Sequence, residues 1–270
     1  MSSPQLIDVT IITVNRNDEE GLEKTIKSVL GQTYTNYQYV VIDGDSDDGS
    51  RAVIDKYTSG IHYWISEPDN GIFHAMNKGI RLAAGKYCHF LNAGDIFVSD
   101  NVLKEVFDGK EYSAPFIVGN QINNFGDSTG LVKAPNRYLT LYDFYWGTIK
   151  HQATFIRRDL FEKYGMYDES LKIISDWKFF LQVIGLHNQQ PEYVDVDIVN
   201  FAWYGMSTDQ KMQQKHDLEK EKVLSECIPP TIRADYEKLH DLSNYEYVIS
   251  SMKRQRLYSI LVKGLTKIFR

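Results

Sequence analysis

Three polar clusters follow short apolar runs of the sequence, and their carboxylates could bind a cation or a nucleotide. The clusters lie at residues 43–48, 67–70 and 92–95. Carboxylates at strand ends can hold a hard divalent cation, which in turn binds a diphosphate. They also accept hydrogen bonds from ribose hydroxyls and from a base N–H. Asp43 and Asp95 each directly follow a predicted strand and are the functional candidates, whereas residues 47–49 are interpreted as turn residues.

The glycine-rich loops that often hold phosphates do not occur in the sequence. We find no Walker-type loop, and no Gly-x-Gly-x-x-Gly follows the first apolar run. A nucleotide bound at these clusters would therefore be held through carboxylates and a metal. The missing dinucleotide fingerprint also argues against a dehydrogenase.

The elements that must position these clusters alternate between strand and helix. Strands are expected at 9–14, 39–42, 61–65 and 87–91, and helices from about 17, at 53–57 and at 72–84. The first helix has a capping-box-like start at Asn17 and Glu20. This rhythm predicts an α/β fold with a Rossmann-like, mostly parallel sheet, in which ligands bind at the carboxyl ends of the strands.

The pattern loosens after the third cluster. Strands are expected at 116–120, 154–156 and 193–201, a hairpin at 123–133, and an amphipathic helix at 176–186. From residue 209 the chain is helical in composition and richly charged. Trp146 and Trp177 could form a platform for a sugar ring, but core packing is the favoured interpretation of both.

Composition narrows the class of protein. The formal net charge of −6 argues against a general nucleic-acid binder. Two cysteines without a partner pattern argue against a disulfide framework or a zinc site, and they suit a reducing compartment. Neither a secretory signal nor an 18-residue apolar window is visible, so the expected location is the cytoplasm.

Four stretches together resemble glycosyltransferase family 2, which has the GT-A fold. They are the first strand and its exit (10–16), the run from 32 to 50 ending in DGDSDDGS, residues 66–79 (SEPDNGIFHAMNKG), and 84–95 ending in NAGD. The third stretch is the most specific and is similar to a bacterial branch that builds surface polysaccharides. The resemblance extends over about residues 6–205.

The resemblance implies an inverting, metal-dependent glycosyltransferase that uses a UDP-sugar donor. Asp43 is expected to contact uridine, and Asp95 to hold Mn²⁺ or Mg²⁺ on the diphosphate. The metal motif of the family carries further acids, whereas residues 92–95 keep only one, and His74 stands where many relatives carry an acid. The remaining residues expected to contact the donor are Thr13, Asn15, Arg16, Asn70, Asn77, Lys78, Asn92 and His151.

Asp176 is the expected catalytic base, because residues 175–180 resemble the family's catalytic-base segment. An inverting transfer is a single displacement and needs one carboxylate to take the proton of the acceptor hydroxyl. A helix N-terminus keeps such a carboxylate ionised. The acceptor is expected to be a glycan in capsule, exopolysaccharide or O-antigen synthesis, and a polyprenyl-diphosphate-linked glycan is one form of it.

The expected domains are a catalytic domain at 1–205, with a donor-binding half at 1–97 and an acceptor half at 98–205, and a helical extension at 206–270. Residues 252–270 contain six basic and no acidic residues beside an apolar stripe. Such a helix can lie on an anionic membrane at the inner face of the plasma membrane, or it can pack on protein. We favour the membrane interpretation because it suits a lipid-linked acceptor.

Two other functions stay open. A sugar-nucleotide pyrophosphorylase has a similar sheet, but it usually opens with a glycine-rich loop that is missing here. A nucleotide- or glycan-binding subunit that has lost activity would explain the single acid at 92–95.

Overall fold

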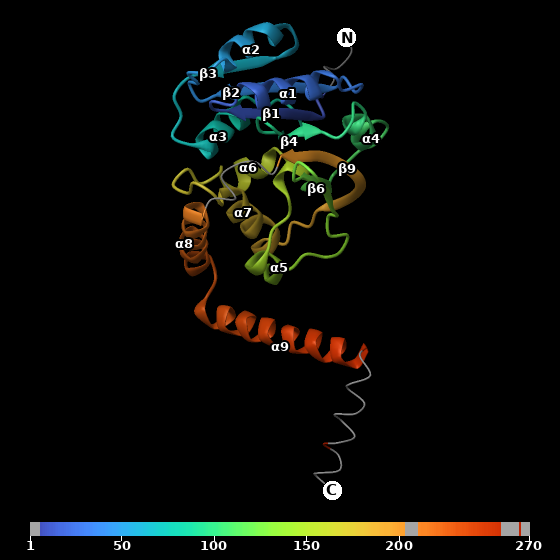
Figure 1. Cartoon of the computed structure of the whole chain (residues 1–270), viewed down its shortest axis with the longest axis vertical. Helices are drawn as coiled ribbons and strands as arrows, with labels where there is room; N and C mark the ends of the chain where they lie inside the picture. The colour runs from blue at the N-terminus through green and yellow to red at the C-terminus, as the bar shows by residue number, and fades with distance from the viewer. Residues whose placement is uncertain (1–5, 203–209, 255–264, 266–270) are drawn as a thin grey trace. The chain divides into compact units, whose positions relative to one another are not determined.

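The computed structural model describes residues 6–202, 210–254 and 265 of the 270-residue chain (Figure 1). The chain divides into two compact units, Met1–Lys220 and Glu221–Arg270. The boundary that the sequence predicts, between residues 205 and 206, falls in the segment 203–209 outside the described residues. It stays a prediction.

The first part of the larger unit follows the predicted alternation of strand and helix. Its elements are β1 Val9–Asn15, α1 Glu19–Leu30, β2 Tyr37–Asp43, α2 Ser50–Tyr57, η1 Thr58–Gly60, β3 Tyr63–Ser66, α3 Ile72–Leu82 and β4 Tyr87–Phe90. All four strands run parallel in the spatial order β3-β2-β1-β4. The α/β fold predicted from the sequence is therefore confirmed.

The second part of this unit extends the same sheet with strands of both directions. Its elements are β5 Ile96–Phe97, α4 Val102–Phe107, β6 Phe116–Asn124, β7 Thr129–Val132, α5 Leu141–Trp146, η2 His151–Ala153, β8 Thr154–Arg157, α6 Asp159–Tyr164, α7 Ser175–Phe180 and β9 Glu192–Ala202. The strand order continues β4-β8-β6-β9-β5, with β7 paired to β6 in the predicted hairpin. The predicted helix at 176–186 forms as α7 followed by a π-helical segment, Leu181–Leu186.

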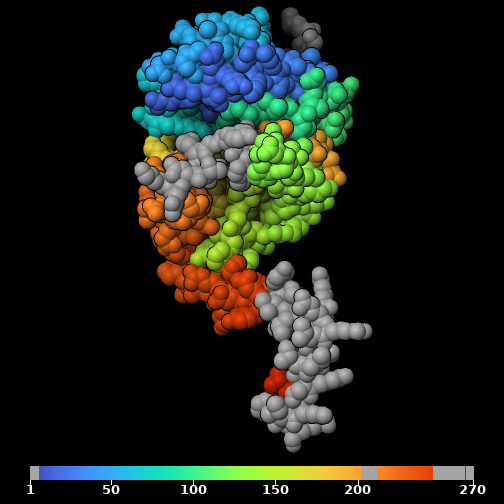
Figure 2. Space-filling model, viewed as in Figure 1, coloured from blue at the N-terminus to red at the C-terminus, as the bar shows by residue number. Residues whose placement is uncertain are grey.

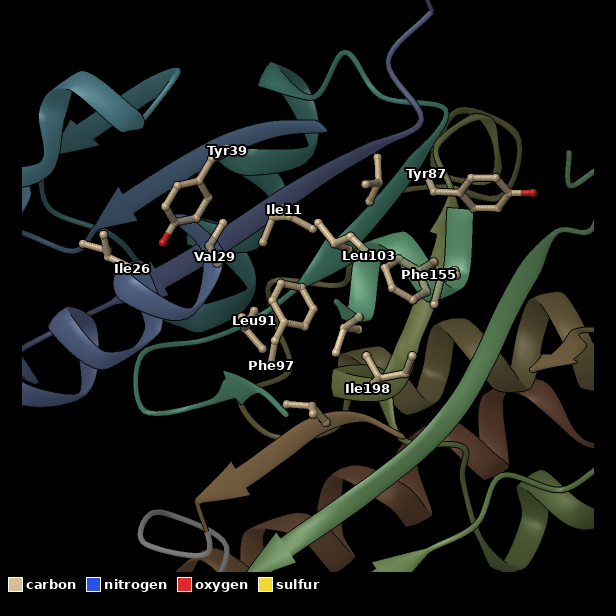
Figure 3. Packing of buried hydrophobic residues seen from close by; sticks show 14 of the residues in the cluster. Ile11, Ile26, Val29, Tyr39, Tyr87, Leu91, Phe97, Leu103, Phe155 and Ile198 are labelled. Carbon is tan, nitrogen blue, oxygen red and sulfur yellow. The ribbon is translucent and has the colours of Figure 1, made fainter. Parts of the chain in front are cut away.

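Helices cover both faces of the sheet. On one face, Ile11 of β1 and Tyr39 of β2 point toward Ile26 and Val29 of α1 (Figure 3). Each fully buried aliphatic side chain of this kind contributes about 1.5–3 kcal/mol to folding. On the other face α3 approaches β1 so closely that a Cβ on Gly79 would lie 2.4 Å from Cγ2 of Ile12. This second face also carries α6 and α7, whose aromatic rings pack with one another and with rings of β4 and β6.

Antiparallel pairing of β4 with β8 joins the two parts of the larger unit. In the space-filling view the blue-to-cyan part and the green-to-yellow part lie directly against each other (Figure 2). Because β8 runs opposite to β4, the start of β8 lies beside the end of β4. The one-turn helix η2, just before β8, is thereby brought to the carboxyl-end edge of the parallel strands.

The start of α1 differs from the prediction. The N-cap is Asp18, whose side chain accepts a hydrogen bond from the Gly21 amide at 3.0 Å, so the predicted capping box of Asn17 and Glu20 is wrong. Asn17 instead has a φ of 53°, a left-handed conformation that Asn tolerates better than most residues. Its side chain accepts a hydrogen bond from the Asp47 amide at 3.0 Å.

The chain after residue 209 is helical where it is described. It forms α8 (Gln210–Cys227) and α9 (Pro230–Arg254), and within the smaller unit Arg233 donates two hydrogen bonds of 2.7 Å to Glu221. Most of the predicted basic tail at 252–270 lies outside the described residues. Within the described ranges, no helix combines the length and the apolar character needed to cross a membrane.

Candidate active site

Strand register places three polar residues side by side at the ends of the parallel strands. Asn15 of β1 pairs with Asp43 of β2, and Asp43 pairs in turn with Ser66 of β3. Residues in register on parallel strands point to the same face of the sheet, so their side chains meet. The clusters predicted at 43–48 and 67–70 therefore begin at the same sheet edge.

The Asp43 carboxylate accepts four hydrogen bonds and is fully buried. Oδ1 accepts from Nδ2 of Asn15 at 2.8 Å and from Oγ of Ser46 at 2.6 Å. Oδ2 accepts from the Ser46 amide at 3.0 Å and from Oγ of Ser66 at 2.7 Å. Burial raises the pKa of Asp43, but the hydrogen bonds from Ser46, Ser66 and Asn15 outweigh it, so the net pKa lies below 3.8. We call these four residues the Asp43 network.

Thr25 of α1 holds the backbone of the loop at 92–95. Its hydroxyl donates to the Asp95 carbonyl at 2.7 Å and accepts from the Gly94 amide at 3.0 Å. Gly94 has a φ of 92°, which favours glycine. Thr25 could not be identified from the sequence, because a threonine inside an amphipathic helix carries no signal for a loop 70 residues later.

The residues present fit a cation that is completed by a bound diphosphate. No group of three or more His, Cys, Asp or Glu side chains gathers as a metal site among the described residues. Asp95 is 4% exposed and supplies one carboxylate. In the same loop, Oδ1 of Asn92 is buried and has no hydrogen-bond partner among the described residues, so it is a second candidate oxygen donor. Mg²⁺ typically binds one or two carboxylates together with substrate phosphates.

The turn after β3 is held by charged and polar side chains. Lys78 of α3 forms an ion pair with Glu67 at 2.7 Å. Lys172 donates to the Asn70 carbonyl at 2.6 Å, and Nδ1 of His74 accepts from the Asn70 amide at 3.0 Å. The structure thus gives His74 a role in fixing this turn.

The exit of β1 and the turn after β3 flank Gly44. A Cβ on Gly44 would lie 2.3 Å from Oδ2 of Asp69 and 3.4 Å from Cδ of Arg16. Arg16 itself is exposed. Because Gly44 has no side chain, the Asp69 carboxylate can lie directly against the backbone at the end of β2.

Two residues predicted to contact the donor have partners inside the protein. Thr13 is fully buried, with its hydroxyl 3.1 Å from that of Tyr39. Asn77 is 1% exposed, donates to the Tyr167 carbonyl at 2.9 Å and to Glu169 at 2.8 Å, and accepts from the Tyr167 amide at 3.1 Å. These positions indicate that both side chains help to hold the fold, and their contact with the donor stays a prediction.

His151 and Asp176 form a close pair. Nδ1 of His151 lies 3.0 Å from Oδ2 of Asp176, and each side chain is 17% exposed. His151 is in η2, beside the end of β4, and Asp176 is in the first turn of α7. The fold therefore brings the predicted base and the predicted donor contact together, which the sequence did not indicate.

Around this pair lie buried polar atoms that have no hydrogen-bond partner in the described part of the chain. They include Nε2 of His151, the Tyr167 hydroxyl and Oγ of Ser175. Burial and then the negative charge of Asp176 raise the pKa of Tyr167 well above 10, so its hydroxyl keeps its proton. Since buried polar groups nearly always have hydrogen-bond partners, we interpret these atoms as places where ligand groups or water bind.

The two tryptophans differ from each other. Trp177 is 6% exposed, and its Nε1 donates to the Phe144 carbonyl at 2.8 Å, so its predicted core position is confirmed. Trp146 is 42% exposed, and core packing was the wrong prediction for it. Trp146 is the last residue of the short helix α5, and its neighbour Tyr145 takes the buried side of that helix.

Comparison with known proteins decides the family. The family model described as "Glycosyl transferase family 2" matches residues 8–171, more than half of the chain. The chain belongs to glycosyltransferase family 2. The resemblance stated from the sequence motifs is confirmed. The matched residues of this glycosyltransferase include the parallel strands that hold the Asp43 network.

Relatives and solved structures agree with this family. An uncharacterised glycosyltransferase of Mycobacterium tuberculosis (strain CDC 1551 / Oshkosh) is 35% identical over 181 residues, covering 64% of this chain and 68% of that protein. The UDP-Glc:α-D-GlcNAc-diphosphoundecaprenol β-1,3-glucosyltransferase WfgD of Escherichia coli is 30% identical over 131 residues, covering 48% of this chain and 52% of WfgD. Mannosyltransferase PcManGT of Pyrobaculum calidifontis, solved with GDP-Man and Mn²⁺, has a TM-score of 0.61 at 13% identity, covering 97% of this chain and 80% of that one. The predicted GT-A fold is confirmed.

Proposed function

We propose that this glycosyltransferase transfers a sugar from a UDP-sugar to a hydroxyl of a glycan acceptor, with inversion and with the help of Mn²⁺ or Mg²⁺. The observation that carries the proposal is the partly buried carboxylate of Asp176, held 3.0 Å from His151 and surrounded by unpartnered buried polar atoms. This edge of the sheet also holds Asp43 and Asp95. The named substrates of WfgD, a UDP-sugar and a diphosphoundecaprenol-linked sugar, support a UDP donor and a lipid-linked acceptor in surface-glycan synthesis.

Asp176 acts as the general base. Its carboxylate takes the proton of the acceptor hydroxyl while that oxygen bonds to the anomeric carbon of the donor sugar. The bond from that carbon to the diphosphate oxygen breaks in the same step, so the configuration inverts. A carboxylate near neutral pH suits this work because it is ionised before the step and neutral after it.

Asp95, with an oxygen of Asn92, would hold the divalent cation. When bound, the cation supplies positive charge that neutralises the diphosphate as it leaves. The Mn²⁺ named in the solved structure of PcManGT supports this assignment. The chain itself contributes the fixed backbone of the 92–95 loop, because Thr25 holds that loop on α1.

The test is turnover with a panel of sugar nucleotides, with Mn²⁺ and then with EDTA. We expect one UDP-sugar to be consumed, EDTA to abolish turnover, and Asp95→Ala to bind the donor weakly even with added Mn²⁺. Asp47→Ala is the matched control, because Asp47 is exposed and belongs to the turn after β2. Full activity in EDTA would reject the metal.

A binding subunit without activity is the second candidate, because residues 92–95 keep a single acid. It predicts that a sugar nucleotide protects the protein against heat and is never consumed with any acceptor. Release of pyrophosphate from a sugar nucleotide would instead identify a pyrophosphorylase.

Membrane contact through residues 252–270 is part of the proposal. We expect a chain truncated after residue 251 to act normally on a short water-soluble acceptor but to lose binding to vesicles of anionic phospholipid. Each basic residue near such a surface contributes about 1 kcal/mol, and the attraction fades as salt rises. Vesicle co-sedimentation at low and high salt measures it. A truncated chain that melts at a lower temperature, together with no vesicle binding by the full chain, would assign the segment to packing on protein.

A further inference from the structure

We propose that His151 is a positioning residue that acts on Asp176 through Nδ1, rather than a ligand of the donor. The inference rests on the proposed function, because it takes Asp176 as the base. Its starting point is the 3.0 Å contact between Nδ1 of His151 and Oδ2 of Asp176.

The contact joins two elements that are distant in the chain. His151 and Asp176 are 25 residues apart, one in η2 and the other in α7, and each side chain is 17% exposed. A second His–Asp contact in the protein has the same length but a different setting. His216 and Asp217 are neighbours on α8, also 3.0 Å apart, with side chains 38% and 64% exposed. Exposed ion pairs contribute little free energy. Of these two pairs, only His151–Asp176 is therefore expected to affect an active site.

Asp176 has one oxygen engaged and one available. Oδ2 faces His151, and no other hydrogen bond to this carboxylate is found among the described residues. A single donor on Oδ2 fixes the rotation of the carboxylate and leaves Oδ1 for the hydroxyl of an acceptor. Orientation of this kind matters because a displacement of about 1 Å can lower a rate roughly 100-fold.

The other groups around the pair do not replace this donor. The Tyr167 hydroxyl is buried, keeps its proton and has no hydrogen-bond partner within the ranges that the structure describes. His89 is fully buried, and burial lowers its pKa to about 3, so it adds no positive charge. Lys178, two residues after Asp176, is paired with Asp168 at 2.6 Å. His151 is thus the donor on which Asp176 depends.

The ring of His151 has a second nitrogen that supports a competing interpretation. Nε2 is buried and has no partner among the described residues, so a bound donor sugar or phosphate could contact it. The two interpretations assign the function of His151 to different nitrogens. They can therefore be separated by side chains that place an amide N–H at only one of the two positions.

The experiment compares His151→Asn with His151→Gln. The amide nitrogen of Asn lies near the position of Nδ1, and that of Gln lies near the position of Nε2. We expect His151→Asn to keep kcat within about 5-fold of the wild type and His151→Gln to lose about 10- to 100-fold. Affinity for UDP, measured by calorimetry, should be unchanged in both. His216→Gln is the matched control, with unchanged kcat.

A pH profile gives a second readout that a merely structural role would not move. A hydrogen bond to the charged form of a carboxylate favours that form. We therefore expect the acid limb of the kcat profile to move to higher pH in His151→Gln and to stay in place in His151→Asn. Melting temperatures of all variants show whether each remains folded.

The outcomes separate the inference from the function on which it rests. Asp176→Asn is measured in the same assay, and normal turnover in that variant would reject the base. Loss of turnover in Asp176→Asn, with better turnover in His151→Gln than in His151→Asn or with weaker UDP binding in either, would overturn the positioning role alone. Unchanged kcat and an unmoved acid limb in both His151 variants would overturn it as well.

Discussion

The Asp43 network and the His151–Asp176 pair lie at one edge of the sheet, yet their carboxylates have different surroundings. Asp43 is fully buried and accepts four hydrogen bonds from protein groups. Among the described residues, Asp176 is partly exposed and has His151 as its one side-chain partner, and the buried atoms around it lack partners. A carboxylate with every acceptor position filled holds strands together, whereas one with free capacity can bind and take a proton.

The difference follows from how each group reaches its place. Asn15, Asp43 and Ser66 are aligned by register between parallel strands, so their contact is part of the sheet itself. His151 and Asp176 come from a one-turn helix and a six-residue helix that meet through tertiary packing alone. We therefore expect substitutions in the Asp43 network to affect stability first, and substitutions in the pair to affect rate first.

The largest expected effect is on catalysis by Asp176→Asn. The amide cannot take a proton, and loss of a general base typically lowers a rate by about 10² to 10⁴. UDP affinity by calorimetry and the melting temperature should both stay near those of the wild type. Turnover close to normal would remove Asp176 from the mechanism and with it the contrast between the two regions.

The next effect is on stability, in Asp43→Asn. In this variant an NH₂ group replaces one carboxylate oxygen and faces hydrogen-bond donors that bond to that oxygen in the wild type. The free energy of unfolding should therefore fall by about 2–4 kcal/mol. Ser66→Ala removes one donor only and should cost about 1 kcal/mol. An unchanged melting temperature together with weaker UDP binding would make Asp43 a donor ligand rather than a structural group.

The same variant has an expected pH signature. The pKa of Asp43 in the folded protein is below 3.8, so its stabilising effect is full above that value and is lost as the pH falls through the lower, folded value. The wild type should therefore lose more melting temperature than Asp43→Asn on acidification from about pH 5 to about pH 3. Parallel curves for the two proteins would contradict this.

A smaller effect than that of Asp43→Asn is expected for Asn77→Ala. Asn77 joins α3 to the segment at 167–169 through three hydrogen bonds, and their loss should cost about 2 kcal/mol. In a unit of this size that is a fall of roughly 4–8 °C in melting temperature. UDP affinity should not change. Weaker UDP binding without a change in melting temperature would restore the donor contact predicted from the sequence.

Much of the fold could be predicted because short-range patterns specify it. Short β-branched runs such as 9–14 are typical of buried strands, and their alternation with amphipathic segments predicts a parallel sheet with ligands at its carboxyl edge. The prediction of where α1 starts was wrong because Asn17, Asp18 and Glu20 are all acceptable near a helix N-terminus. The choice fell to Asp18 once the side chain of Asn17 bonded to the neighbouring loop.

The sequence by itself determined the family, and its motifs point to Asp43, Asp95, His151 and Asp176 as the candidates for chemistry. Only the tertiary structure decided what surrounds each of these groups. Register brought Asn15 and Ser66 to the Asp43 carboxylate, and Thr25 of α1 fixed the 92–95 loop. The antiparallel pairing of β8 with β4 placed His151 so that its Nδ1 lies 3.0 Å from Oδ2 of Asp176. Hydrogen bonds reach only about 3 Å, so partners distant in the chain become known only when the fold brings them together.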